Sequence, residues 1–144
     1  MAEALGVPFY DTDEEIVRRA GRSVGEIFRA EGEEGFRLIE AETAAELLSC
    51  PAPSVIACGG GVILREENRA RLREKGFIVW LRRDPDEVLK DRAVLRRPPI
   101  CGQRSNYLLL LEKRTPIYAS LADITVDCGS VAETVAEIRK EFAK

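Results

Sequence analysis

The stretch "VIACGGGVIL", residues 55–64, joins an apolar run to three consecutive glycines, Gly59, Gly60 and Gly61. Because glycine loses more conformational freedom on folding than any other residue, three in succession carry a large entropic cost. Such a stretch is either a tight turn between a strand and a helix or bare backbone that a ligand approaches closely. It does not match the phosphate-binding motif G-x-x-x-x-G-K-[ST], since no Lys and Ser or Thr follow. Its backbone N–H groups suit a small anionic or hydroxylated substrate.

The regions on either side of the triplet predict an α/β fold. Apolar runs predict strands at residues 7–11, 53–58, 77–81 ("FIVWL") and 123–128. Helical spacing and capping residues predict helices at 12–21, 23–32, 33–49, 65–76, 84–95, 106–122 with a break near Pro116, and 130–144. This alternation is typical of a three-layer parallel sheet with helices on both faces. We expect one domain over residues 1–144, with ligands at the carboxyl ends of the strands.

The composition narrows the chemistry that is open to the chain. Its 144 residues are 45% hydrophobic, carry a formal net charge of -3 and include no histidine. The acidic balance argues against nucleic-acid or membrane-surface binding, and no apolar run approaches the roughly 20 residues that span a bilayer. Four cysteines, none in a C-x-x-C pair, argue against a zinc site and favour reduced thiols in the cytoplasm. Without histidine, catalysis depends on carboxylates, arginine, lysine and backbone groups.

Two acidic residues follow the first predicted strand. Asp11 and Asp13, in "YDTDEE" (10–15), stand where a helix begins, so either can cap free backbone N–H groups. Carboxylates in this place also suit chemistry, because one can bind Mg²⁺ while the other accepts a proton or hydrogen bond from a substrate hydroxyl. The two interpretations are compatible when different aspartates serve them.

Arginines supply the other candidate groups. Arg37 lies on a predicted helix, where it is either a fork that binds a carboxylate or a surface residue paired with a neighbouring glutamate, Glu33, Glu34 or Glu40. The basic loop at about residues 93–105 is either a solvated loop or a lid that closes on phosphates; its neighbourhood contains Arg92, Arg96, Arg97 and Arg104. Arg114 precedes Pro116 and by itself indicates only a helix cap.

In this order, the motifs resemble one family. The segments "YDTDEE" (10–15), "GFRLIEAE" (35–42), "ACGGG" (57–61), "RRP" (96–98) and "EKRTPIY" (112–118) together resemble shikimate kinase, over residues 2 to about 128. The resemblance implies a P-loop fold of the nucleoside-monophosphate-kinase type. It also implies ATP-dependent phosphorylation of the shikimate 3-hydroxyl, a step in aromatic amino-acid (chorismate) biosynthesis. The implied ligands are shikimate, ATP and Mg²⁺, and the implied protein is a cytoplasmic monomer.

The resemblance assigns a role to each acidic and basic candidate. Asp11 is implied to help hold Mg²⁺, and Asp13 to bind the shikimate hydroxyl and act as the catalytic base. Arg37 and Arg114 are implied to grip the shikimate carboxylate from two sides.

The remaining roles concern the pocket wall and ATP. The triplet is implied to line the shikimate pocket, with Gly60 making the closest contact, beside Gly59 and Gly61. Arg97 is implied to be the lid arginine that reaches ATP during catalysis, and Arg92 lies on the same ATP-binding side.

The sequence departs from the family in two places. The family's first strand and Walker A loop would precede residue 2, and no such loop motif occurs among the 144 residues. Cys58 stands where the family usually has Thr. We therefore expect a fold lacking its first strand and P-loop, weak ATP binding and impaired catalysis. We also expect either marginal stability or a dimer paired through strand edges. The alternatives are a non-catalytic shikimate-kinase-like binding protein and another small-molecule P-loop kinase, such as a gluconate kinase.

Overall fold

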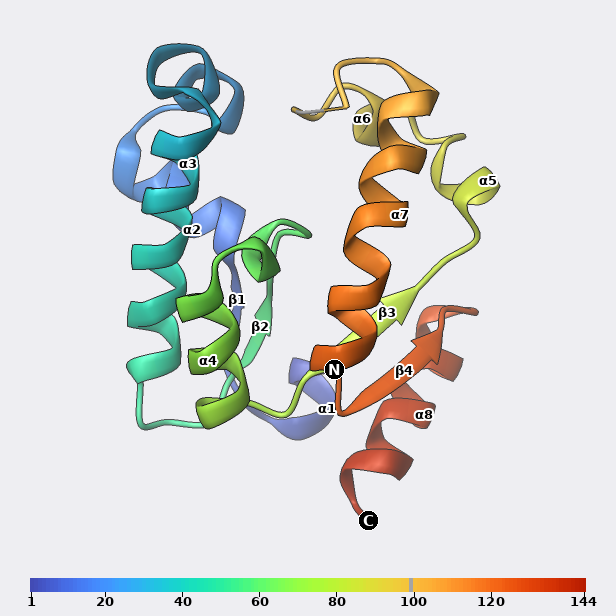
Figure 1. Ribbon diagram of the computed structural model, residues 1–144. Helices are drawn as coiled ribbons and strands as arrows, with labels where there is room; N and C mark the ends of the chain where they lie inside the picture. Colours follow the sequence, from blue (N-terminus) through green and yellow to red (C-terminus); the bar gives the residue numbers. More distant parts are fainter. Residues whose placement is uncertain (99) are drawn as a thin grey trace. The chain divides into compact units, whose positions relative to one another are not determined.

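The computed structural model describes residues 1–98 and 100–144, which divide into two compact units, Met1–Gly76 and Phe77–Lys144. In chain order, the first unit contains α1 (Ala2–Leu5), β1 (Phe9–Asp11), α2 (Thr12–Ala20), α3 (Val24–Ser49), β2 (Val55–Ala57), the 3₁₀ turn η1 (Val62–Leu64) and α4 (Glu66–Lys75). The second contains β3 (Val79–Arg82), α5 (Pro85–Val88), α6 (Arg92–Leu95), α7 (Arg104–Leu121), β4 (Ile124–Asp127) and α8 (Val131–Phe142) (Figure 1). Each unit holds one two-stranded parallel sheet, so the expected parallel pairing is confirmed. The single domain over residues 1–144 stays a prediction.

The sheet of the first unit carries the glycine triplet. β1 pairs with β2 in parallel, from Phe9 opposite Val55 to Asp11 opposite Ala57. Because the carboxyl ends of parallel strands lie on the same side of a sheet, residues 11–13 and residues 59–61 lie next to each other at the carboxyl ends of β1 and β2. The sequence predicts a ligand at these carboxyl ends.

Local sequence signals set the helix ends in this unit. Gly21 closes α2 in the left-handed conformation, with φ 63. Ser23 and Glu26 form the predicted capping box, in which the Glu26 N–H donates to Ser23 Oγ at 3.2 Å and the Ser23 N–H donates to Glu26 Oε2 at 2.7 Å. Gly32, with φ 71, interrupts α3 where the sequence predicts a boundary between two helices.

The interruption at Gly32 folds α3 back on itself. In a straight helix, residues eight positions apart are separated by about 12 Å along the axis. The rings of Phe28 and Phe36 nevertheless have centroids only 4.6 Å apart. Phe36 forms the core of the unit with Ile16 and Ile27, both 0% exposed. Consequently, α2 packs against both arms of α3.

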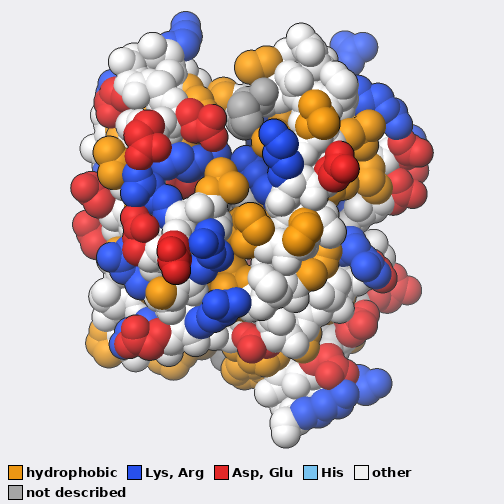
Figure 2. All heavy atoms as spheres, in the orientation of Figure 1, with side chains coloured by type: hydrophobic (Ala, Val, Ile, Leu, Met, Phe, Trp, Pro, Cys, Tyr) orange, Lys and Arg blue, Asp and Glu red, His pale blue; other side chains and the backbone are white. Residues whose placement is uncertain are grey.

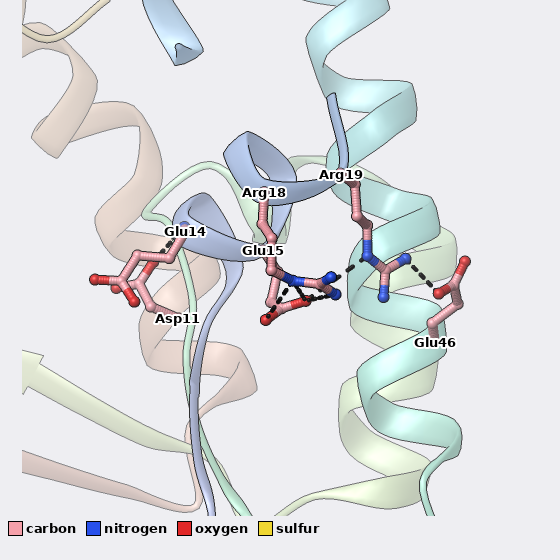
Figure 3. Close-up of polar contacts among 6 residues, drawn as sticks. All are labelled: Asp11, Glu14, Glu15, Arg18, Arg19 and Glu46. Carbon is pink, nitrogen blue, oxygen red and sulfur yellow. Dashed lines mark hydrogen bonds and ion pairs between the residues drawn. The ribbon is translucent and has the colours of Figure 1, made fainter. Parts of the chain in front are cut away.

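Charged residues link the outer surfaces of α2 and α3. Arg19 on α2 forms an ion pair with Glu46 on α3, and its Nε lies 3.7 Å from Glu15 Oε2 (Figure 3). Arg18 contacts the same Glu15 carboxylate at 2.7 Å, and its hydrogen bond is the main cause of the lowered pKa of Glu15. Since exposed ion pairs add little stability, these contacts chiefly align two helices that the apolar core holds together.

Charges of both signs cover the surface. Lys and Arg side chains are interspersed with Asp and Glu side chains over the face drawn in Figure 2. Within residues 1–98 and 100–144, no helix has the length and apolar character needed to cross a bilayer.

The second unit has its own parallel pair. β3 pairs with β4 from Val79 opposite Ile124 to Arg82 opposite Asp127. The predicted strand at 77–81 therefore begins two residues later and extends one residue further. At the added end, Arg82 and Asp127 are paired across the two strands, and Arg82 Nη2 donates to Asp127 Oδ2 at 2.7 Å. Before the start, the Ile78 N–H donates to the Asp123 side chain at 2.6 Å instead of to a strand carbonyl.

Aromatic contacts pack the helices of this unit against β3 and the residues before it. Trp80 of β3 stacks on Tyr118 of α7, with ring centroids 5.6 Å apart. Phe77, just before the strand, meets Phe142 of α8 edge to face at 5.2 Å. α7 and α8 are thus each tied to the β3 segment by an aromatic pair.

Two predicted helices differ in the structure. The predicted helix at 84–95 is two short helices, because the Asp91 side chain accepts the Ala93 N–H at 2.8 Å and starts a new helix. The predicted break near Pro116 is wrong, since α7 runs through it. A proline removes one helical hydrogen bond, to the carbonyl four residues earlier. That residue, Glu112, is exposed, so water can satisfy its carbonyl.

The core of the first unit can be tested with two neighbouring residues of α2. Ile16→Ala removes a side chain that is 0% exposed, and we expect the free energy of unfolding to fall by about 2–5 kcal/mol. Val17→Ala, at a position 38% exposed, is the control, with an expected change within about 0.5 kcal/mol. Urea denaturation measures both, and equal effects would contradict the core assignment.

Candidate active site

The end of β1 and the start of α2 place Asp11 in a structural role. Its Oδ1 accepts the backbone N–H of Asp13 at 2.9 Å. The same atom accepts the N–H of Glu14 at 3.2 Å (Figure 3). Asp11 is therefore the N-cap of α2, as the capping interpretation predicts. Asp13, in the first turn, does not provide this cap.

Arg37 and Glu40 form a buried ion pair on α3. Arg37 is 7% exposed and Glu40 is 1% exposed, and Arg37 Nη1 donates to Glu40 Oε2 at 2.7 Å. Glu33 approaches Arg37 Nη2 at 3.5 Å. Pairing with a neighbouring glutamate is thus confirmed, whereas the surface location considered for Arg37 is wrong. The helical spacing of Arg37 and Glu40 in the sequence predicts that they pair, but it does not predict that both side chains are buried.

The glycine triplet is what makes room for this arginine. A Cβ atom on Gly61 would lie 2.2–2.5 Å from the atoms of the Arg37 guanidinium, which is far inside van der Waals contact. Gly61 is therefore needed for close approach of the backbone to Arg37, as the entropic cost of the triplet indicates. The guanidinium also lies near the Phe36 ring, 5.2 Å from its centroid.

Two carboxylates meet at Gly59. A Cβ atom there would lie 3.2 Å from Glu40 Oε1 and 3.3 Å from Asp13 Oδ1. The first unit thus brings Asp13, the triplet and Arg37 together, with Glu40 among them. Sequence reasoning gave Glu40 no part in the site, although its place three residues after Arg37 was the available signal.

A second polar group supports the turn after the triplet. Asn68 of α4 is 1% exposed, and its Nδ2 donates to the carbonyl of Val62 at 3.0 Å. Arg69 Nη1 donates to the carbonyl of Ile63 at 2.7 Å. These bonds hold η1 against α4 and so restrain the backbone that follows Gly61. Neither residue was predicted to have this role.

The remaining predicted residues belong to the second unit. Arg114 lies half-buried on α7, Arg92 is the exposed first residue of α6, and Arg97 is exposed after α6. The Arg97 carbonyl accepts the Ile100 N–H at 2.8 Å. The predicted lid at about 93–105 includes residue 99, which lies outside the described residues.

Arg37 and Arg114, two of the predicted site residues, each have a buried Nε atom without a hydrogen-bond partner. Among the side-chain atoms of residues 1–98 and 100–144, four buried N or O atoms lack a hydrogen-bond partner: Arg37 Nε, Arg65 Nε, Asn68 Oδ1 and Arg114 Nε. Buried polar groups are generally paired in native proteins, so such atoms mark places where a ligand or water is expected.

No preformed metal centre stands out in the described part of the chain. Residues 1–98 and 100–144 contain no group of three or more His, Cys, Asp or Glu side chains that could hold a metal ion. Magnesium commonly takes only one or two protein carboxylates and completes its shell with water and phosphate. The Asp11 and Asp13 carboxylates are compatible with a site of that kind.

Cys58 lies beside the acidic residues of the site. Part of the residue reaches solvent, yet burial raises the pKa of its thiol to about 11, and the charges of Glu40, Asp11 and Asp13 add to this effect. The thiol is therefore protonated at neutral pH and is a poor nucleophile.

The parallel strands and the helices that alternate with them define an α/β protein, with its candidate site at the carboxyl ends of β1 and β2. Comparison with known proteins then identifies the family. The family model described as "Shikimate kinase" matches residues 1–143. The chain is 44% identical to the shikimate kinase of Symbiobacterium thermophilum over 99% of this chain and 85% of that protein. It is 39% identical to the enzyme of Cereibacter sphaeroides, over 99% and 73% of the two chains.

Solved structures show the same relationship. A shikimate kinase from Acinetobacter baumannii in complex with shikimate matches with a TM-score of 0.87 and 32% identity, covering 99% of this chain and 81% of that chain. The shikimate kinase of Aquifex aeolicus matches with a TM-score of 0.80 and 33% identity, covering 99% and 84%. The chain belongs to the shikimate kinase family, and its P-loop nucleoside-monophosphate-kinase-like fold is confirmed. The family phosphorylates shikimate in aromatic amino-acid biosynthesis.

The raised pKa of Cys58 predicts slow alkylation. With a pKa of about 11, roughly 0.1% of the thiol is ionised at pH 8, so we expect iodoacetamide to modify Cys58 at least tenfold more slowly than the exposed Cys50. Peptide mass spectrometry over time measures both rates, and urea should remove the difference. Because the folded state holds this proton more tightly, its contribution to stability is present at neutral pH and is lost as pH rises toward about 11. Equal rates in the folded protein would contradict the assignment.

Proposed function

We propose that this chain binds shikimate at the carboxyl end of the β1–β2 sheet and phosphorylates its 3-hydroxyl with ATP. The observation that carries the proposal is the buried Nε donor of Arg37, which lacks a hydrogen-bond partner beside the glycine triplet. A planar carboxylate would satisfy this donor, and a fork-to-fork contact favours a carboxylate over a single-point acceptor. Shikimate supplies such a group, and the Acinetobacter baumannii relative is described in complex with it.

The polar groups at Gly59 fit the rest of this substrate. Asp13 and Glu40 bring carboxylate oxygens to one point, where they can accept hydrogen bonds from ring hydroxyls. The triplet presents no side chain, so a small polyol ring can approach the backbone there, with Gly60 as the closest contact. An acid with several hydroxyls therefore matches this site better than a purely apolar ligand.

The proposed reaction needs little covalent chemistry from the protein. The 3-hydroxyl oxygen attacks the γ-phosphorus, the bond to the ADP oxygen breaks, and the hydroxyl proton passes to an Oδ atom of Asp13. Arg37 orients the acceptor, which lowers the entropic part of the barrier, and the family resemblance assigns the same role to Arg114. Arg97 and Arg92 stabilise charge on the transferring phosphoryl group. Asp11 would help to hold Mg²⁺, which would supply further neutralisation of phosphate charge.

We also propose a cytoplasmic location and an edge-paired dimer. Each described strand has one hydrogen-bonded neighbour, and an unpaired strand edge is a template for another strand. The four cysteines are free, which fits a reducing compartment. A monomer by sedimentation equilibrium would contradict the dimer. The weak ATP binding expected from the sequence stays a prediction, which titration of the polypeptide with ATP tests.

The assignment of Arg37 can be tested without removing its charge. Arg37→Ala would remove the cation from a buried ion pair with Glu40 and destabilise the fold by about 3–5 kcal/mol. Arg37→Lys keeps a cation beside Glu40 but loses the fork, so we expect shikimate binding at least tenfold weaker by calorimetry. Arg18→Lys, at an exposed ion pair on α2, is the matched control and should leave affinity unchanged. Unaltered affinity in Arg37→Lys, or no binding by the wild-type chain, would overturn the proposed function.

The triplet provides an independent test. Gly61→Ala places a methyl group 2.2–2.5 Å from the Arg37 guanidinium, so the arginine must move and shikimate affinity should fall by at least tenfold. Gly25→Ala is the control, because a Cβ there meets nothing within 4 Å, and alanine should stabilise α3 by about 0.5–1 kcal/mol. Calorimetric titration and thermal melting separate the two effects. A Gly61→Ala protein with normal affinity would show that the approach of Gly61 to Arg37 does not matter for binding.

A further inference from the structure

Thr12 makes a tertiary hydrogen bond in the centre of the site. It lies between the two aspartates, is 0% exposed, and has no part in the roles described above. Its Oγ1 accepts the backbone N–H of Gly59 at 3.0 Å, across 47 positions of sequence. The bond therefore joins the turn after β1 to the first residue of the glycine triplet.

The position of this bond follows from how the β1–β2 ladder ends. The last ladder pair is Asp11 opposite Ala57, because the backbone at Thr12 turns into α2. The Gly59 N–H lies just beyond that pair, where no β1 backbone continues to accept it. The Thr12 hydroxyl takes the place of the missing carbonyl, which avoids the cost of an unpaired N–H in a partly buried turn.

This bond determines what Gly59 can offer a ligand. Its N–H is bonded to Thr12, and its carbonyl accepts the Val62 N–H at 3.0 Å. A Cβ atom added to Gly59 would meet Asp13 Oδ1 and Glu40 Oε1, as described above. Two carboxylates therefore lie against Gly59. Because its N–H is already bonded to Thr12, that N–H is not available to donate to a substrate.

We propose that Thr12 is a positioning residue for the acceptor hydroxyl. Its hydroxyl holds Gly59 at a fixed distance from residues 11–13. The Asp13 carboxylate and the rest of the triplet therefore keep a fixed position relative to each other and can contact the same substrate. The inference rests on the proposed function and deepens it, since it names the group that aligns Asp13. Asp13 contacts the substrate, whereas Thr12 acts through Asp13 and Gly59.

The test compares Thr12→Val, which keeps the shape and removes the acceptor, with Thr12→Ser, which restores it. We expect shikimate to bind Thr12→Val about tenfold more weakly than wild type, and Thr12→Ser within twofold of wild type, by calorimetry. Amide hydrogen exchange by NMR should show faster exchange at Gly59 in Thr12→Val and protection in Thr12→Ser. If valine prevents folding, Thr12→Ala carries the same comparison. Thr43→Val, at a threonine of α3 that is 2% exposed, is the control and should leave both readouts unchanged.

A double-mutant cycle separates positioning from general destabilisation. If Thr12 acts by aligning Asp13, its effect on shikimate affinity should largely disappear in an Asp13→Asn background, which gives a non-additive cycle. Additive effects, normal affinity in Thr12→Val, or unchanged Gly59 exchange would each overturn the inference. Absence of shikimate binding in the wild type would overturn the proposed function instead, and the Gly59 exchange rates would still decide whether the Thr12 bond holds that residue.

Discussion

The first unit depends on the buried ion pair between Arg37 and Glu40. Burying two charges is costly unless each has a partner, so either residue alone would destabilise the fold. The pair also needs space, which only a residue without a side chain at position 61 provides. This one contact therefore constrains both the second arm of α3 and the residue type at position 61. The Nε atom of Arg37 remains buried without a hydrogen-bond partner.

Different groups of the first unit contribute to its stability and to the geometry of the candidate site. The apolar contacts of Ile16, Ile27 and Phe36 hold α2 and α3 together, while the exposed ion pairs of Arg18 and Arg19 add alignment. The polar groups at the strand ends contribute less to stability and more to geometry. Each restrains backbone near the triplet, so a small rigid substrate meets groups that need no rearrangement.

Sequence patterns predicted the local structure well because its causes are local. The capping box at Ser23 and the helix boundary at Gly32 depend on residues within a few positions of one another. The family could also be predicted from the sequence, because Asp13, Arg37 and the triplet belong to short motifs that follow one another in a characteristic order. The burial of Glu40 and the bond from Gly59 to Thr12 were not, because they arise when distant segments meet. Pro116 was misjudged because solvent exposure, rather than the proline itself, decides whether the helix tolerates it.

Gly32 also has a consequence for how relatives of this chain can vary in length. The residue separates two arms of α3, and only the second arm carries Arg37 and Glu40. A residue inserted before Gly32 shifts the first arm and leaves the rotational setting of the second unchanged. A residue inserted between Gly32 and Arg37 turns both side chains by about 100° around the helix axis, away from the triplet. Insertions and deletions should therefore accumulate on one side of this glycine and be excluded from the other.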